Sequence, residues 1–278
     1  MITDKQRKER LNGIGGSDMP IILGLSHYKT PYQLFLEKRG ITIEEKEESQ
    51  SQYWGNKLER VIIDEFIVRN KVTVERPDTV VHPIYSFMRA NVDGYIPEYN
   101  SVLEIKCSSS FLSKEWGESG SDIMPIQYIV QVAHYCSCLN TDKAYVAVLI
   151  GGNDYREYIY ERDLQLESKI IDSAKEFWEM VQNNTPPHPK NIDDIILMYP
   201  NHMDAKSIIA DDSNKYDLSR LNELKKSYRS INNEINSLKL NVMNSMKDAE
   251  YISDELGSIM ATWKANSKGR RIFLLKGE

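Results

Sequence analysis

The sequence is poor in cysteine, and its three cysteines form no recognisable site. Cys107, Cys136 and Cys138 are an odd number of thiols without zinc-ligand spacing, and no fourth thiol exists for an iron–sulfur cluster. This pattern argues against both a disulfide framework and a thiolate metal centre. We therefore expect three reduced cysteines at or near the core of a cytoplasmic protein.

Long apolar runs and surplus positive charge are also missing. No stretch approaches the ~18 consecutive apolar residues of a membrane-spanning helix, and no signal peptide is recognisable, so we expect no membrane association. The chain carries 35 Lys and Arg against 41 Asp and Glu, a formal net charge of −6. Bulk attraction to nucleic acid is not indicated, and any surface that binds phosphate must be local.

The length of 278 residues and an apolar content of 41% suit one full domain plus a small appendage. The proline-rich segment 184–189 cannot continue a helix, so we predict a core domain over residues 1–190 and a C-terminal extension over 191–278. Apolar spacing, capping signals and β-branched runs predict the elements. Helices are expected from Thr30 to Gly40 and at 52–70, 125–139 (begun by Ser121 or Asp122), 163–183, 191–199 and 217–250, and strands at 71–75, 79–82, 87–96, 101–107, 144–150, 155–161, 257–264 and 271–275.

The segment from Val102 to Lys106 carries the most informative pattern. In a strand, Glu104 and Lys106 share one face while the residues between and before them point into a core. Asp93 lies eleven residues upstream, just before a glycine, where a hairpin could bring its carboxylate beside that of Glu104. Two carboxylates that are desolvated together repel unless a cation lies between them, so this arrangement predicts Mg²⁺ or Mn²⁺. The plain alternative is a solvated Glu–Lys pair, but the apolar flanking residues favour the site.

Two helical patterns supply further polar candidates. Glu59 borders the apolar stripe of the helix at 52–70, from which it could lean over the end of the sheet. Gln127, Gln131 and Tyr135 recur at i, i+4 and i+8 on an otherwise apolar helix, and any of them that is buried needs a partner. All four residues could also be ordinary helix residues.

The glycine-rich turn before residue 19 is a candidate for binding phosphate. Its backbone N–H groups and the Ser17 hydroxyl would form a nest for an oxyanion, to which Arg10 could add a guanidinium contact. The alternative is a simple turn in which Ser17 or Asp18 caps the next helix.

Together these segments resemble the YqaJ-like viral recombinases, relatives of phage lambda exonuclease among the restriction-endonuclease-like nucleases. The resemblance covers about residues 10–183, and its specificity comes from the shared order and spacing of several motifs. The matching stretches are Gly13–Asp18, Ile22–Ser26, Tyr28–Tyr32, Trp54–Glu59, Asn91–Gly94, Leu103–Lys106, Gln131 with Tyr135, and Ala147–Arg156.

The resemblance implies an α/β (α+β) fold, with a restriction-endonuclease-like core in which helices flank a mixed central sheet, followed by a C-terminal helical and hairpin extension. It implies that Asp93, Glu104 and the Ile105 carbonyl bind a divalent metal and that Lys106 assists the attacking water. Glu59 would hold a second ion, directly or through water. The sequence departs from the lambda-type pattern at Pro83, where that pattern has an additional acidic residue.

The remaining site residues also follow from the resemblance. Arg10 and Ser17 have the seven-residue spacing of the arginine and serine that recognise a 5′-phosphate in lambda exonuclease and its relatives. Gln131 would orient the nucleophile or the backbone, and Tyr135 would contact DNA or have a structural role.

The function implied is a metal-dependent 5′→3′ exonuclease that acts on double-stranded DNA ends and prepares single strands for phage-type recombination. A ring-shaped homo-oligomer and a single-strand-annealing partner protein, in a bacterial or phage-infected cytosol, belong to the same expectation. Two alternatives stay open. One is an endonuclease or nickase of the same fold, and the other is a non-catalytic DNA-binding assembly module that uses the C-terminal helix.

The C-terminal extension carries an apolar seam from Leu218 to Val242 on its long helix, which suggests packing against the body of the protein or another helix. A basic cluster beside Trp263 could touch DNA or could be solvated, and its members are Lys264, Lys268, Arg270 and Arg271.

Overall fold

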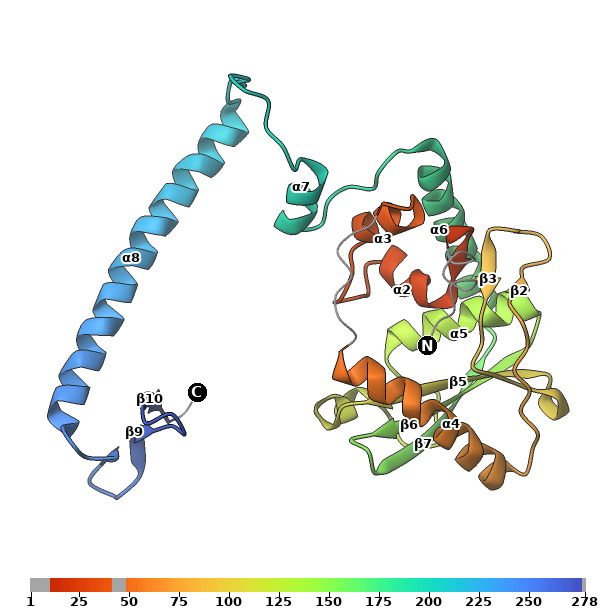
Figure 1. Ribbon diagram of the computed structural model, residues 1–278, viewed down its shortest axis with the longest axis horizontal. Coiled ribbons are helices and arrows are strands. Elements are labelled where there is room, and N and C mark those ends of the chain that lie inside the picture. The colour runs from red at the N-terminus through yellow and green to blue at the C-terminus, as the bar shows by residue number, and fades with distance from the viewer. Residues whose placement is uncertain (1–10, 42–48, 277–278) are drawn as a thin grey trace. The chain divides into compact units, whose positions relative to one another are not determined.

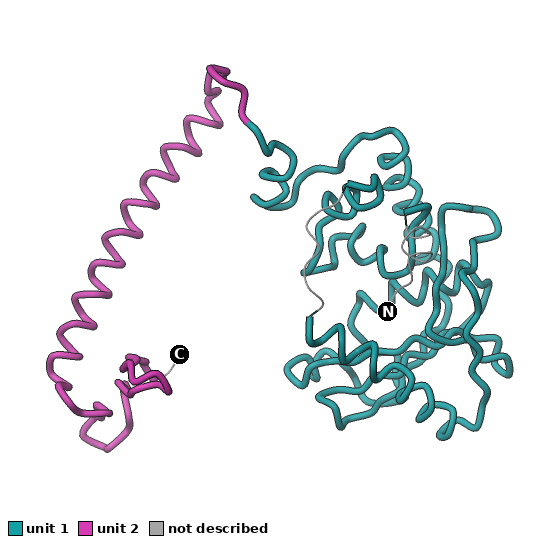
Figure 2. The backbone as a smooth tube through the Cα atoms, viewed as in Figure 1, with its two compact units in different colours: residues 1–201 teal, residues 202–278 magenta. Residues whose placement is uncertain are grey.

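The structure is a computed structural model that describes residues 11–41 and 49–276 (Figure 1). Arg10, the predicted phosphate ligand, lies outside the described residues. The chain divides into two compact units, Met1–Asn201 and His202–Glu278 (Figure 2). The prediction of separate domains at 1–190 and 191–278 remains a prediction.

A four-stranded mixed sheet forms the centre of the first unit. Its strands are β4 (Gly94–Ile96), β5 (Ser101–Ser108), β6 (Lys143–Ile150) and β7 (Asp154–Glu161), in that spatial order. β5 and β6 run parallel over eight residue pairs, whereas β4 pairs with β5 and β6 pairs with β7 in the antiparallel sense. A parallel pair needs a crossover connection, which here includes a helix between β5 and β6.

Helices cover both faces of this sheet. On one face, α4 (Gln50–Asn70) packs Phe66 and its neighbours against Leu103 and Ile105 of β5. On the other face lies α5 (Ile126–Leu139), the crossover helix, in a second buried cluster with Val102. The period-2 alternation of β5 therefore places Leu103 and Ile105 in a core, as the sequence pattern predicts, and the cover of α5 over the opposite face is an addition from the fold.

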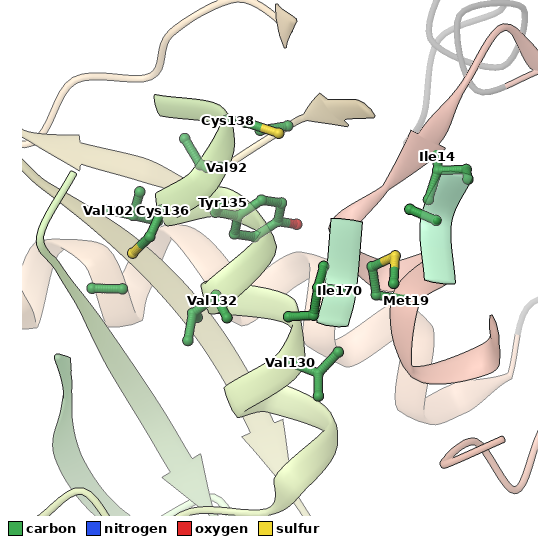
Figure 3. Close-up of a cluster of buried hydrophobic side chains, with 14 of the residues drawn as sticks. Ile14, Met19, Val92, Val102, Val130, Val132, Tyr135, Cys136, Cys138 and Ile170 are labelled. Atoms are coloured by element: carbon green, nitrogen blue, oxygen red, sulfur yellow. The ribbon is translucent and has the colours of Figure 1, made fainter. Parts of the chain in front are cut away.

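A smaller sheet and further helices complete the first unit. β1 (Ile14–Gly15) pairs parallel with β3 (Met88–Ala90), and β2 (Val80–Val81) pairs antiparallel on its other side. Figure 3 shows Ile14 and Met19 in the cluster that also holds Val130 and Tyr135 of α5. The remaining elements are η1 (Gly16–Asp18), α2 (Met19–Ile22), α3 (Pro31–Lys38), η2 (Pro97–Tyr99), η3 (Ser110–Glu115), α6 (Leu164–Asn183) and α7 (Ile192–Met198).

Several local predictions are confirmed and others are wrong. Thr30 caps α3 with Gln33 in a reciprocal capping box, as expected. Residues 71–75 do not form a strand, because only the Glu75–Tyr95 bridge pairs there. The N-cap of α5 is Pro125 and not Ser121 or Asp122, because a turn at 117–124 separates those residues from the helix. Cys136 and Cys138 are buried, whereas Cys107 is exposed.

The second unit consists of one long helix and a three-stranded antiparallel sheet. The helix α8 (Asp212–Met246) has 35 residues, and β8 (Tyr251–Ser253), β9 (Ile259–Ala265) and β10 (Arg271–Leu275) follow it. No helix among the described residues is long and apolar enough to cross a membrane.

One cation of the C-terminal basic cluster has a structural role. The Arg271 guanidinium lies 3.7 Å from the centroid of the Trp263 ring and donates hydrogen bonds to the carbonyls of Lys247 and Ala249 beyond the end of α8. Arg271 thus joins the sheet to the helix, and its charge is used within the unit.

Candidate active site

The β4–β5 hairpin brings the predicted acids together. Gly94 pairs with Leu103, which places Asp93 next to Glu104 across the two strands. The Ile105 backbone N–H donates a hydrogen bond of 2.9 Å to Asp93 Oδ2 and so fixes the orientation of this carboxylate. The juxtaposition of Asp93 and Glu104 expected from the sequence is therefore present.

The turn of this hairpin lies elsewhere than expected. Gly94 is a strand residue, and the chain reverses at η2 and at Asn100, whose φ of 45° is left-handed. Gly94 is required for packing, because a Cβ built there would lie 2.5 Å from Val74 Cγ1. The glycine after Asp93 thus allows Val74 to approach β4 closely.

Glu104 is the most deeply buried acid of the site, with 2% of its surface exposed. Its Oε1 accepts hydrogen bonds from Lys106 Nζ at 2.5 Å and from Gln131 Nε2 at 2.6 Å. Its Oε2 is buried without a partner among the described residues. Burial, followed by repulsion from Asp93, raises the pKa of Glu104 to about 8.

Lys106 lies beside Glu104 on the same face of β5, as strand alternation predicts. Its ammonium lies 5.0 Å from the centroid of the Tyr128 ring. Burial lowers the pKa of Lys106, but attraction to Glu104 and Asp93 outweighs burial and raises it overall. Lys106 therefore stays charged at neutral pH and is a positive partner for the acids beside it.

Glu59 reaches the same end of the sheet from α4. A small pocket of about 70 Å³ is lined by Glu59 and Asp93 together with residues of the segment 74–76. Glu59 Oε1 is paired with Arg76 Nη1 at 3.0 Å, while burial and the charge of Asp93 raise the pKa of Glu59. The pairing with Arg76 was not foreseen, because the sequence shows no spacing that links these two residues.

Gln131 and Tyr135 connect the acids to the glycine turn. Gln131 Nε2 donates a 3.0 Å hydrogen bond to the Tyr135 hydroxyl as well as bonding Glu104. The Tyr135 ring packs directly on Gly16, where a Cβ would lie 2.4 Å from ring atom Cε1. Gln131 and Tyr135 therefore form a polar column on α5 from the Gly16 turn to Glu104. They are two of the three polar residues predicted to share one face of this helix.

Gly16→Ala is expected to disturb this column. The new methyl group cannot fit beside Tyr135, so either the ring or the turn must move, at a cost of about 1–3 kcal/mol in the free energy of unfolding. We expect weaker activity together with a lower midpoint of urea denaturation. Gly55→Ala is the matched control, since nothing lies within 4 Å of a Cβ at that helical position. Equal stability of the two variants would contradict the close contact.

Ser17 lies on the same turn and is exposed, as a ligand for a DNA end must be. Asp18 is the N-cap residue of α2, but its side chain makes no capping hydrogen bond to that helix; its Oδ2 instead accepts from the Gly15 N–H across η1 at 2.8 Å and from Lys38 Nζ at 2.6 Å. Ser17 is thus left to the solvent side of η1. Arg10 lies outside the described residues, so the structure locates Ser17 but not its predicted partner in binding the 5′-phosphate.

The oxygen donors of this site fit a divalent ion. The carboxylates of Asp93 and Glu104 and the backbone carbonyl of Ile105 are hard ligands of the kind that Mg²⁺ and Mn²⁺ prefer, and the unpartnered Glu104 Oε2 needs a positive partner. Among residues 11–41 and 49–276, no group of three acidic, histidine or cysteine side chains is close enough to hold a metal by itself. Water and substrate oxygens would complete the coordination, as is usual for Mg²⁺.

The first unit is thus a mixed sheet flanked by helices, with two acids and a lysine at its antiparallel hairpin, as the sequence predicts for the core. The chain matches an alkaline exonuclease, LHK-Exo from Laribacter hongkongensis, with a TM-score of 0.55 at 17% identity, covering 66% of this chain and 94% of that one. The same enzyme in complex with dAMP matches equally, at 18% identity. The likeness confirms the predicted fold class.

The sequence comparisons give the family. Residues 6–144 match the YqaJ-like viral recombinase domain. The protein YqaJ of Bacillus subtilis (strain 168) is 34% identical over 272 residues, which covers 95% of this chain and 84% of that protein. The chain belongs to the YqaJ-like viral recombinase family, as its motifs indicated.

Proposed function

We propose that this protein is a divalent-metal-dependent exonuclease that degrades double-stranded DNA from its ends in the 5′→3′ direction. The carrying observation is the buried Glu104 carboxylate, which has one unpartnered oxygen and lies beside Asp93 and Lys106. Such an arrangement is costly for folding alone, and it suits a site that binds a cation and a phosphodiester. Family membership and the exonuclease fold support the same conclusion.

The residues of the site have separate tasks in this proposal. Asp93, Glu104 and the Ile105 carbonyl hold one ion, and Glu59 holds a second, directly or through water. Mg²⁺ or Mn²⁺ bound there would supply positive charge for the scissile phosphate and make a water molecule more acidic. The Lys106 ammonium stabilises negative charge at the attacking oxygen or the phosphate.

Gln131 has an orienting task. Its amide is held between Glu104 and the Tyr135 hydroxyl, so it keeps the carboxylate in one rotamer and presents its remaining atoms to the nucleophile or the DNA backbone. The contact between Tyr135 and Gly16 keeps this column in register with the turn that carries Ser17.

Recognition of the DNA end would use few contacts, because the chain as a whole is acidic. Ser17, with Arg10, would bind the terminal 5′-phosphate and so make hydrolysis depend on an end. The single strands produced would serve phage-type recombination with a single-strand-annealing protein in the cytosol. A ring of several copies around the duplex would keep the enzyme on one strand.

The test is digestion of linear duplex DNA labelled at either the 5′ or the 3′ end, with a 5′-phosphate or a 5′-hydroxyl, in Mg²⁺ or in EDTA. We expect degradation only with the metal, beginning at the 5′ end and faster with the phosphate. A covalently closed circle is the control and should remain intact. Metal-dependent cutting of the circle would instead support the endonuclease or nickase alternative. Binding without degradation of any substrate would support the non-catalytic module.

A further inference from the structure

The long helix of the second unit carries a seam of apolar residues at strict heptad spacing. Steps of three and four residues alternate without interruption through seven positions, which correspond to a and d of three successive heptads and a of a fourth. We call these residues the α8 seam: Leu221, Leu224, Tyr228, Ile231, Ile235, Leu238 and Val242.

The α8 seam is narrow. The flanking e and g positions between Leu221 and Val242 are all polar: Lys225, Ser227, Asn232, Glu234, Lys239 and Asn241. A helix that docks on a globular body shows a broader stripe that includes e or g, whereas a seam of a and d alone is the pattern of a coiled coil. A 3.5-residue period also keeps facing a second helix that runs alongside.

Nothing within the second unit covers the α8 seam. Its first six residues are between 43% and 70% exposed, and only Met246, at the end of α8 near the sheet, is buried. Each such side chain exposes on the order of 100 Å² of surface, so the six together offer roughly 600 Å². This approaches the roughly 800 Å² per partner of a standard interface and reaches the upper range for the largest apolar patch of a monomer.

The described helices of the first unit lack a matching seam. On α4, the exposed apolar residues are Tyr53, Trp54, Val61 and Val68, and the last three form a single row without the second row that a coiled coil needs. The short helix α7 has 7 residues, too few for two heptads. Among the described helices, the surface that matches the α8 seam in length and spacing is therefore the same seam on another copy.

We propose that α8 pairs with α8 of a second copy of this chain to form a coiled coil along the α8 seam. The charges at the flanks permit this, because Lys225, Glu234 and Lys239 leave each helix with a net charge of only about +1 there and little mutual repulsion. A strongly charged partner of another kind is not indicated by the same flanks.

Two substitutions on α8 test the pairing in the full-length chain. Leu238 lies in the seam and is 58% exposed, and Leu240 lies two residues further at the outer f position and is 67% exposed. Leu238→Lys and Leu240→Lys introduce the same charge on the same helix, and neither side chain is needed to fill a core. Sedimentation measured without DNA, from submicromolar to high micromolar protein, gives the mass of each.

We expect the wild type to associate with rising concentration, Leu238→Lys to require at least about tenfold more protein for the same step, and Leu240→Lys to behave as the wild type. If the first unit also forms oligomers, Leu238→Lys should remove only the association step that depends on α8. Nuclease activity of both variants reports that the first unit is intact. Equal masses for the two variants at all concentrations would overturn the proposal. A second result would also overturn it: the wild type shows no association step, and Leu238→Lys only lowers the melting temperature. That result indicates that α8 docks within its own chain.

Discussion

Glu104→Gln is expected to lower the rate of DNA hydrolysis by at least about 10³-fold, a loss typical of removing a central charged group from an active site. The amide keeps the shape of the side chain and can still accept hydrogen bonds from Lys106 and Gln131, which both reach Oε1 in the structure. It cannot supply the negative charge that binds a divalent ion beside Asp93. The substitution therefore separates the charge of Glu104 from its packing.

The same variant should remain folded. The neutral amide relieves the burial of a carboxylate that lacks one partner, but it also removes the negative partner of the Lys106 ammonium, so we expect these opposing effects to leave the variant folded in EDTA. Urea denaturation checks this, and rates on linear duplex DNA check activity. Glu161→Gln, at the exposed end of β7 where Glu161 pairs with Lys143, is the matched control and should keep full activity. Activity of Glu104→Gln near that of the control would exclude Glu104 from the chemistry.

The pairing of Glu104 with Lys106 was predictable because strand geometry is simple. Side chains two residues apart on β5 share a face, and Leu103 and Ile105 determine which face points to the core under α4. The approach of Asp93 followed from the hairpin, although the turn was assigned to the wrong residues. The two-residue period of a strand is thus enough to predict which side chains lie together on one pair of strands.

Contacts between distant segments were not predictable in the same way. The sequence does not show that α5 covers the polar face of β5, so the burial of Glu104 and its bond to Gln131 emerge only from the fold. The pairing of Glu59 with Arg76 and the packing of Gly16 on Tyr135 also join segments that no spacing rule connects. Motifs located these residues, and tertiary structure determined their partners.

His134 shows how far this burial extends beneath the site. It follows Gln131 by three residues on α5 and is 0% exposed, with Nε2 2.9 Å from the Arg89 carbonyl oxygen. Because a carbonyl can only accept, Nε2 carries the proton, and Nδ1 is buried without a partner among the described residues. Burial, the dominant cause, lowers the pKa of His134 to about 4. The folded protein therefore holds a neutral imidazole.

This burial predicts a specific loss of stability in acid. The unfolded chain binds a proton at His134 below pH ~6.5, while the folded chain does so only near pH 4. Stability due to the neutral imidazole is thus complete above pH ~6.5 and falls as the pH decreases towards 4, by about 3 kcal/mol over that window at ~1.4 kcal/mol per unit. His134→Gln does not titrate, so its stability should fall less steeply between pH 6.5 and 4.

Urea denaturation of the wild type and His134→Gln at pH 7, 6, 5 and 4 measures this difference directly. All other titratable groups are the same in both proteins. The difference between the free energies of unfolding of the wild type and the variant therefore isolates the contribution of His134. His27→Gln, at an exposed position, is the control and should follow the wild-type slope. Parallel slopes for the wild type and His134→Gln would mean that the imidazole is solvated in the folded state.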